Sequence, residues 1–256
     1  MTATSWRWRM KAAGTHMALS AVVIGFIALG MFYVWYPEPF RSLSGGLSLF
    51  FLVALVDLVL GPGATLVVSS PGKSKREWRT DVGLIVLIQL AALAYGVWTV
   101  YQARPVFLAF EIDRFRAVHA VEVPLELLDR APPGARVLPL LGPGMVAVRP
   151  FVDAKEEADA TMAALGGVHL GARPDLWMAY EDSVPQVLAV ARPVRELLDR
   201  RSDAREAWVR SPVLDKLNPD EVLHLPLVGR ASFWTILLDR HSAQPVGYLP
   251  IDPYDP

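Results

Sequence analysis

Three long apolar runs in the first hundred residues dominate the pattern of this chain. They cover residues 17–36, 47–68 and 82–101, and a helix needs about 20 apolar residues to cross a bilayer. Aromatic residues close the first and third runs, as is typical where a helix reaches the membrane–water interface. The first run is longer than the apolar core of a signal peptide and has no small-residue cleavage site, so we expect a retained helix. The pattern predicts a bundle of three transmembrane helices.

The second run carries an acidic residue, Asp57, near its middle and the sequence Gly61-Pro62-Gly63 one turn later. On insertion scales an Asp costs about 2.5–3.5 kcal/mol, whereas each Leu, Phe or Val returns about 0.3–0.6 kcal/mol. Fourteen Leu, Val and Phe residues lie between positions 47 and 68, so we expect the segment to insert despite its acid. The Gly-Pro-Gly sequence predicts a break in the helix.

Small and polar residues form one stripe on the second run and another on the third, both with 3-4-3 spacing. The stripes consist of Ala54, Asp57, Gly61 and Ala64, and of Gln89, Ala92, Gly96 and Thr99. Antiparallel packing would bring Asp57 and Gln89 to the same depth, where a polar group can hydrogen-bond between helices. Alternatively Asp57 faces a partner helix, since intramembrane acids are functional candidates. The candidate partner-binding residues are Asp57, Ala54, Gly61, Pro62, Gln89 and Gly96.

Charge and composition divide the chain near residue 103 and indicate its orientation. The whole chain is 53% hydrophobic, too apolar for an ordinary soluble domain. Residues 1–103 hold eight Lys and Arg against four Asp and Glu, whereas residues 104–256 hold 17 against 22. The segment 1–16 and the loop around residues 73–79 are basic, and basic loops stay in the cytoplasm. We therefore expect a cytoplasmic N-terminus and, in a bacterium, a periplasmic domain from 104 to 256.

The sequence of residues 104–256 predicts a soluble α+β domain. Apolar and polar residues alternate over 106–112, as in a half-buried strand. Asp153 is a suitable N-cap for a helix that ends before Gly166-Gly167. An apolar stripe over 187–197 predicts a helix kinked at Pro193. Residues 233–239 and 245–251 predict two strands joined by a polar loop.

Candidate chemistry is sparse. The chain has no cysteine, which excludes disulfides and thiolate metal sites. Its five histidines are isolated and show no metal-ligand spacing. We find no nucleotide-binding or nucleophile motif. Basic residues of the second part alternate with acids, which argues against nucleic acid as a partner. The sequence thus predicts no catalytic residue, metal or cofactor, and a protein that is not an enzyme.

The chain has four distinctive sequence elements: Tyr36-Pro37, Gly45-Gly46, Asp57 with Gly61-Pro62, and Glu111-x-Asp113-Arg114-Phe115. With these elements the chain resembles the TfpX/TfpZ family of type IV pilin accessory proteins. The resemblance is firmest over 35–115 and 227–254. Among these, Glu111, Asp113 and Arg114 mark the start of the periplasmic domain. Gly63 and Ala64 stand where the family pattern has larger apolar residues.

The resemblance implies an inner-membrane assembly factor or chaperone for a major pilin, which has one hydrophobic helix in the bilayer and a head in the periplasm. The small-residue stripes would meet the pilin helix, the periplasmic domain would meet the pilin head, and lipid would surround the bundle. Self-association stays open. Two alternatives are a pilin-modifying membrane transferase and a membrane-anchored sensor of a periplasmic ligand.

Overall fold

The computed structural model describes residues 3–70 and 72–254, which form two compact units. Residues 1–2, 71 and 255–256 fall within the predicted N-terminal segment, basic loop and C-terminal domain, and lie outside the described residues. The first unit holds Met1–Trp35 and Gly46–Gln102, and the second holds Tyr36–Gly45 and Ala103–Pro256. The chain therefore passes between the units three times, after residues 35, 45 and 102.

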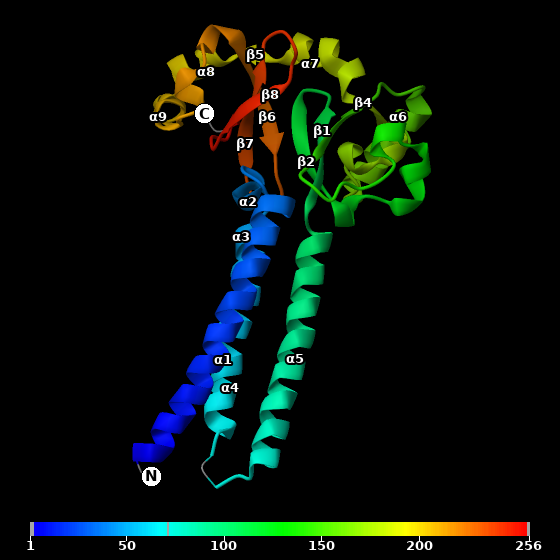
Figure 1. The fold of residues 1–256 in the computed structure, drawn as a ribbon. Coiled ribbons are helices and arrows are strands. Elements are labelled where there is room, and N and C mark those ends of the chain that lie inside the picture. Colours follow the sequence, from blue (N-terminus) through cyan, green and yellow to red (C-terminus); the bar gives the residue numbers. More distant parts are fainter. Residues whose placement is uncertain (1–2, 71, 255–256) are drawn as a thin grey trace. The chain divides into compact units, whose positions relative to one another are not determined.

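Three long helices make up the first unit, as predicted (Figure 1). Within the described residues, the segments long and apolar enough to span a membrane are Trp6–Trp35, Gly46–Val68 and Lys75–Gln102. The first consists of α1 (Ala3–Gly30) and a π-helical end, η1 (Met31–Trp35). The third is α5 (Lys75–Gln102). Both begin several residues before their apolar runs.

The second spanning segment stays helical through its Gly-Pro-Gly sequence, so the predicted break is wrong. It consists of α3 (Gly46–Leu55), a π-helical turn η2 (Val56–Leu60) and α4 (Gly61–Val68). Pro62 lies in the first turn of α4. Pro62 has no N–H to donate to the preceding turn, and the hydrogen-bond ladder is already irregular here because a π-helical turn comes directly before it.

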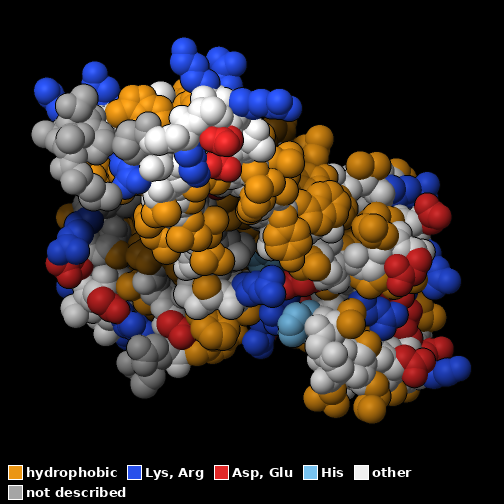
Figure 2. Space-filling view, turned by 90° about the horizontal axis from the view of Figure 1, so that it is seen from below, with side chains coloured by type: hydrophobic (Ala, Val, Ile, Leu, Met, Phe, Trp, Pro, Cys, Tyr) orange, Lys and Arg blue, Asp and Glu red, His pale blue; other side chains and the backbone are white. Residues whose placement is uncertain are grey.

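The outer faces of these helices are strongly apolar. Figure 2 shows hydrophobic side chains over much of the face seen from below, with Lys and Arg side chains at several points of its edge. Examples of large exposed side chains are Phe26 on α1, Leu55 on α3 and Leu87 on α5. Polar contacts join the ends of the three segments at Ser69. Arg9 Nε donates to the main-chain oxygen of Ser69, and Trp78 Nε1 donates to its hydroxyl oxygen. Such a surface is suited to a lipid solvent.

An eight-stranded mixed sheet forms the centre of the second unit, in the order β4-β3-β1-β2-β6-β7-β8, with β5 pairing with β6 off this path. The strands are β1 (Pro105–Glu111), β2 (Arg114–His119), β3 (Gly144–Val148), β4 (Trp177–Ala179), β5 (Arg192–Pro193), β6 (Val222–Val228), β7 (Phe233–Asp239) and β8 (Pro245–Leu249). Pairs β1–β3 and β2–β6 are parallel, and the others are antiparallel. This is the soluble α+β fold expected from the sequence.

Individual elements confirm some expectations and correct others. The capped helix is α6 (Ala154–Leu165), with Asp153 accepting a hydrogen bond from Glu156 N at 2.8 Å. The hairpin β7–β8 also forms as predicted. Strand β1 is buried along its whole length, not on one face, because the sheet is covered on both sides. Pro193 separates two helices instead of kinking one, since it forms part of strand β5. The remaining helices are α7 (Val184–Val190), α8 (Val194–Arg200) and α9 (Ser202–Arg210).

The loop between the first two spanning segments belongs to the core of the second unit. The short helix α2 (Phe40–Leu43) of this loop packs with the sheet residues. Tyr36 and Leu43 are fully buried, and the main-chain oxygen of Leu43 accepts a hydrogen bond from Ala231 N at 3.0 Å. A side chain at Gly229 would collide with Leu43. The loop is thus an integral part of the hydrophobic core.

Truncation of this loop side chain should destabilise the second unit. Leu43→Ala removes a fully buried side chain, and such changes cost about 2–5 kcal/mol. We expect a lower midpoint of denaturation for the full-length protein in micelles, followed by tryptophan fluorescence. Leu165→Ala is the control, because Leu165 is exposed at the end of α6. An equal midpoint for both variants would contradict the core role of the loop.

The second unit should also lose stability in mild acid because of His224. This side chain is only 6% exposed, and its burial, together with Arg192 and Arg200, lowers its pKa to about 4. Between pH 6.5 and 4 the unfolded chain therefore binds a proton that the folded chain does not, so stability falls as the pH falls. The full loss is about 3 kcal/mol, since one pH unit corresponds to about 1.4 kcal/mol.

Denaturation midpoints measured across this pH range would test the prediction. His224→Leu should flatten the dependence, whereas His241→Leu, at an exposed position, should keep it. A His224→Leu protein with the acid sensitivity of the unaltered chain would show that another group is responsible.

Candidate functional site

Asp57 lies in the π-helical turn of the second spanning segment and is only 4% exposed. Its Oδ1 atom is buried and accepts no hydrogen bond from the part of the chain that the structure describes. A buried acceptor without a donor costs about 1–3 kcal/mol, and in lipid no water can replace the donor. π-Helical turns occur frequently at functional sites, so both the residue and its local backbone mark this position.

Gln89 on α5 reaches Asp57 from the neighbouring helix, which confirms that the two residues lie at the same depth. Its Nε2 atom donates a hydrogen bond to the main-chain oxygen of Asp57 at 3.2 Å. Pro62 has no N–H, so it cannot give that oxygen the next i→i+5 bond of the π-helical turn. Gln89 supplies a donor instead. Its own Oε1 atom is buried without a partner among the described residues, which leaves two unpaired acceptors close together.

Two glycines allow the second segment and α5 to approach closely. A Cβ atom at Gly61 would collide with the Gln89 amide, and one at Gly96 would lie 2.7 Å from a methyl group of Val53. Ala54 and Pro62 are buried on the same segment. The small-residue stripe inferred from spacing therefore forms a helix–helix contact, as small residues do in membranes.

Burial departs from the predicted stripe after Gly61. Sequence spacing predicted Ala64 as its next member, but Thr65 is buried and Ala64 is only half-buried. Thr65 lies four residues after Gly61 within α4, so the two side chains share one face of that helix. Thr65 Oγ1 lies 2.6 Å from His16 Nδ1 on α1. Sequence reasoning missed both residues, because His16 was judged only by its lack of histidine neighbours.

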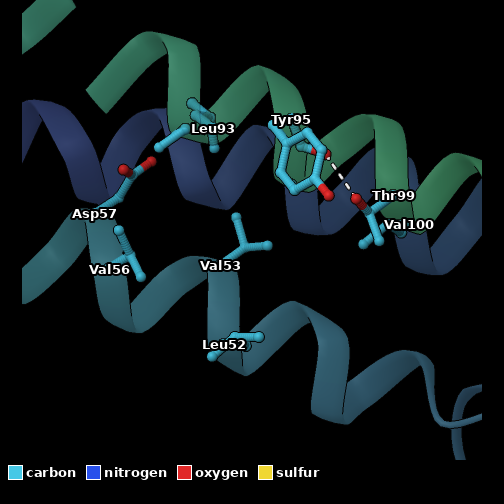
Figure 3. Close-up of a pocket in the computed structure, with 10 residues that line it drawn as sticks. Leu52, Val53, Val56, Asp57, Leu93, Tyr95, Thr99 and Val100 are labelled. Atoms are coloured by element: carbon cyan, nitrogen blue, oxygen red, sulfur yellow. Dashed lines mark hydrogen bonds between the residues drawn. The ribbon is translucent and has the colours of Figure 1, made fainter. Parts of the chain in front are cut away.

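A cavity of about 270 Å³ lies between the second segment and α5 (Figure 3). Its walls are mainly apolar side chains, including Leu52, Val56 and Leu93. In Figure 3, Asp57 is drawn at one end of this space and Thr99 near the other. The Thr99 hydroxyl already donates to the Tyr95 main-chain oxygen at 2.9 Å. Among the described residues that line this cavity, Asp57 is the one with a buried side-chain oxygen, Oδ1, that has no hydrogen-bond partner.

A second cavity of about 160 Å³ lies between α1 and α5, and Asp57 also lines it. Its other polar residues are His16, Ser20 and Gln89. Asp57 therefore borders open space on both sides of its contact with α5. The arrangement can accept a hydrogen bond from a donor on a molecule that enters either space, in surroundings that favour apolar groups.

The predicted residues at the start of the second unit have a structural arrangement. Glu111 is buried, pairs with Arg116 at 3.0 Å and accepts a hydrogen bond from Gly171 N at 2.6 Å. Asp113 and Arg114 form an exposed ion pair at 2.7 Å. Asp113 therefore raises the pKa of Arg114. Glu111 holds a loop onto the sheet, and Arg116 is the partner that sequence reasoning did not identify.

No group of three or more His, Asp or Glu side chains that could hold a metal ion occurs among residues 3–70 and 72–254. The features that distinguish the site are its buried acceptors, its close helix contact and its apolar cavities.

A bulky residue at Gly61 should separate the second segment from α5. Gly61→Leu would displace Gln89 from Asp57, and overpacking of this kind costs about 1–3 kcal/mol. Gly63→Leu is the matched control, because a Cβ atom there meets nothing within 4 Å. We expect a lower melting temperature in micelles for the first variant alone. Equal melting temperatures would mean that Gly61 is not a packing contact.

Comparisons with known proteins place the chain among proteins of fimbrial assembly. A family model described as "Fimbrial assembly protein FimB" matches residues 4–45. Two proteins of Dichelobacter nodosus, the fimbrial assembly proteins of serogroup E1 and of serogroup I, are each 34% identical over 233 residues. These matches cover 90% of this chain and 91% of each relative.

The fimbrial assembly protein of serogroups C1 and C2 from the same organism is 39% identical over 121 residues, which cover 47% of this chain and 92% of that protein. No solved structure matches the chain. Because the similarity to the first two relatives extends over nearly the whole of both sequences, this chain belongs to the FimB family of fimbrial assembly proteins.

Proposed function

We propose that this chain is an inner-membrane assembly factor, or chaperone, that binds the major pilin of a type IV pilus. Two lines of support meet here. The relatives are named fimbrial assembly proteins, and the sequence resembles the TfpX/TfpZ pilin accessory proteins. A pilin waiting in the membrane has one apolar helix and a head outside the bilayer, and this chain has a membrane unit and a folded head to match both parts.

The observation that carries the helix-binding part is the unpartnered Asp57 oxygen beside an apolar cavity. A helix lying along α3 and α5 could place apolar side chains between Leu52 and Leu93 and a hydrogen-bond donor near Asp57. Recovering an unpaired buried acceptor is worth about 1–3 kcal/mol. The site therefore favours a helix that combines small or apolar residues with one donor at the middle of the membrane.

The proposed orientation has a cytoplasmic N-terminus and a periplasmic head. The basic residues before the first span and in the second loop favour the cytoplasm for both. The first loop, Tyr36–Gly45, shares one compact unit with Ala103–Pro256, so both must lie on the same side of the membrane. Three spans meet that requirement. A periplasmic head lies where it can contact the head of a pilin.

We further propose that the chain acts by binding and not by catalysis. The cavities beside Asp57 are lined mainly by aliphatic side chains, which suit a helix better than a polar donor substrate. A modifying transferase would leave a mass difference on the pilin. The mass of pilin from cells lacking this protein should therefore equal that of pilin from complete cells.

Crosslinking from two neighbouring alanines should test pilin binding directly. Ala91 and Ala92 are both exposed, but Ala92 lines the larger cavity and Ala91 does not. A photoreactive amino acid at position 92 should crosslink to the major pilin in intact membranes, and one at position 91 should give several-fold less product. The substitution Asp57→Leu, made in the protein that carries the photoreactive amino acid at position 92, should leave membrane insertion intact and reduce the yield of the pilin crosslink.

Equal crosslinking from positions 91 and 92 would mean that the cavity does not define the contact. Absence of any pilin product, together with unchanged pilin levels and piliation after deletion of the gene, would overturn the proposed function.

A further inference from the structure

The loop before β3 in the second unit exposes several large apolar side chains. Val137, Leu140 and Leu141 have exposed fractions of 79%, 58% and 75%. Between them, Leu138 packs against the core cluster that contains Val106 and Trp177. The loop is therefore fixed at its centre while its other side chains point away from the core.

Hydrogen bonds attach this loop to Arg104. The Arg104 Nε atom donates to the main-chain oxygen of Pro139 at 3.4 Å, and the Arg104 main-chain oxygen accepts from Ala120 N at 3.0 Å. Val121, next to Ala120, is a further exposed apolar residue. Two separate segments with exposed apolar side chains thus meet at one buried arginine.

Arg104 is covalently close to the membrane. The third spanning helix, α5, ends at Gln102, and two residues of extended chain cover at most about 7 Å. Trp98 and Tyr101 lie in the last turns of α5, where aromatic residues mark the membrane–water interface. The polar layer of a bilayer adds about 5–7 Å on each side of the hydrocarbon. The chain at Arg104 therefore lies at the edge of the lipid headgroups.

From these contacts we propose that residues 137–141 form a further membrane contact, in which Val137, Leu140 and Leu141 enter the headgroup layer of the bilayer. We commit to lipid as the occupant of this apolar surface, because the loop is hydrogen-bonded to Arg104, which follows the last residue of a spanning helix by only two positions. This contact is separate from pilin binding. It fixes the head at the membrane surface through side chains that no spanning segment contains.

The chemistry of the loop suits a lipid interface. Apolar side chains that lie at the boundary between headgroups and acyl chains gain from leaving water. Arg136 is exposed next to Val137, and a guanidinium is well suited to lipid phosphates. Pro139 limits the flexibility of the loop, which reduces the entropy lost when the loop is held at an interface.

The sheet provides a matched position at the opposite end of the unit. Strand β3 runs parallel to β1, from the pair Gly144–Phe107 to the pair Ala147–Phe110. The loop 137–141 precedes β3 and lies at the Arg104 end, whereas Val152 follows β3 and lies at the other end. Val152 is also 79% exposed, like Val137. The two valines therefore differ in position but not in type or exposure.

Labels at these two positions test the proposal in the full-length protein. The chain contains no cysteine, so Val137→Cys and Val152→Cys each accept a single environment-sensitive fluorophore. Each protein is reconstituted into vesicles of phosphatidylethanolamine and phosphatidylglycerol. We expect a label at 137 to be quenched by nitroxide-bearing lipids and to be several-fold less sensitive to aqueous iodide than a label at 152.

Equal iodide quenching at both positions, without quenching by nitroxide lipids, would overturn the proposal. Protection of position 137 that requires a high protein-to-lipid ratio, again without nitroxide quenching, would also overturn it and would indicate a contact between copies of the chain. Melting temperatures of both variants serve as the folding control. Loss of pilin crosslinking would not affect this result, because the vesicles contain no pilin.

Discussion

The packing of Leu43 against Gly229 joins the loop between the first two membrane helices to the core of the soluble head. Only a residue without a side chain at 229 leaves room for Leu43, and Ala231 adds a main-chain hydrogen bond to the same residue. A loop that would otherwise be a ten-residue connection becomes a buried element. The chain thereby crosses between the membrane unit and the head at three points, and each spanning segment is connected directly in sequence to the head at one end.

The membrane unit follows different rules from the head, because its solvent offers no hydrogen bonds. The head buries an acid, Glu111, and provides both an arginine and a main-chain donor for it. The membrane unit buries Asp57 with one oxygen unpaired and opens cavities on both sides of it. In water such an arrangement would be only a local defect. In lipid, the unpaired oxygen and the apolar cavities favour a neighbouring helix that brings a hydrogen-bond donor and apolar side chains. This is the basis of the proposed function.

The features that follow from periodicity or composition were predictable from the sequence. These include the three spans, the contact between Asp57 and Gln89, the capped helix after Asp153 and the hairpin near the end. Features that depend on an irregular turn or on distant packing were not. Thr65, not Ala64, is buried after Gly61, and Thr65 contacts His16 of another helix, far away in the sequence. Apolar and polar residues alternate along strand β1, yet both of its faces are buried. The segments that cover the sheet lie far from β1 in the sequence, so the alternation alone could not show this.

The loop Tyr36–Gly45 is synthesised early, but its packing partners β6, β7 and β8 come from the last forty residues of the chain. A domain of this kind cannot complete its core until the whole polypeptide has been made and delivered to one compartment. If the first span were inserted in reverse, Tyr36, Phe40 and Leu43 would be stranded across the bilayer from the strands that bury them. Folding of the head therefore serves as a check on membrane insertion, since only the correctly threaded chain can close its hydrophobic centre.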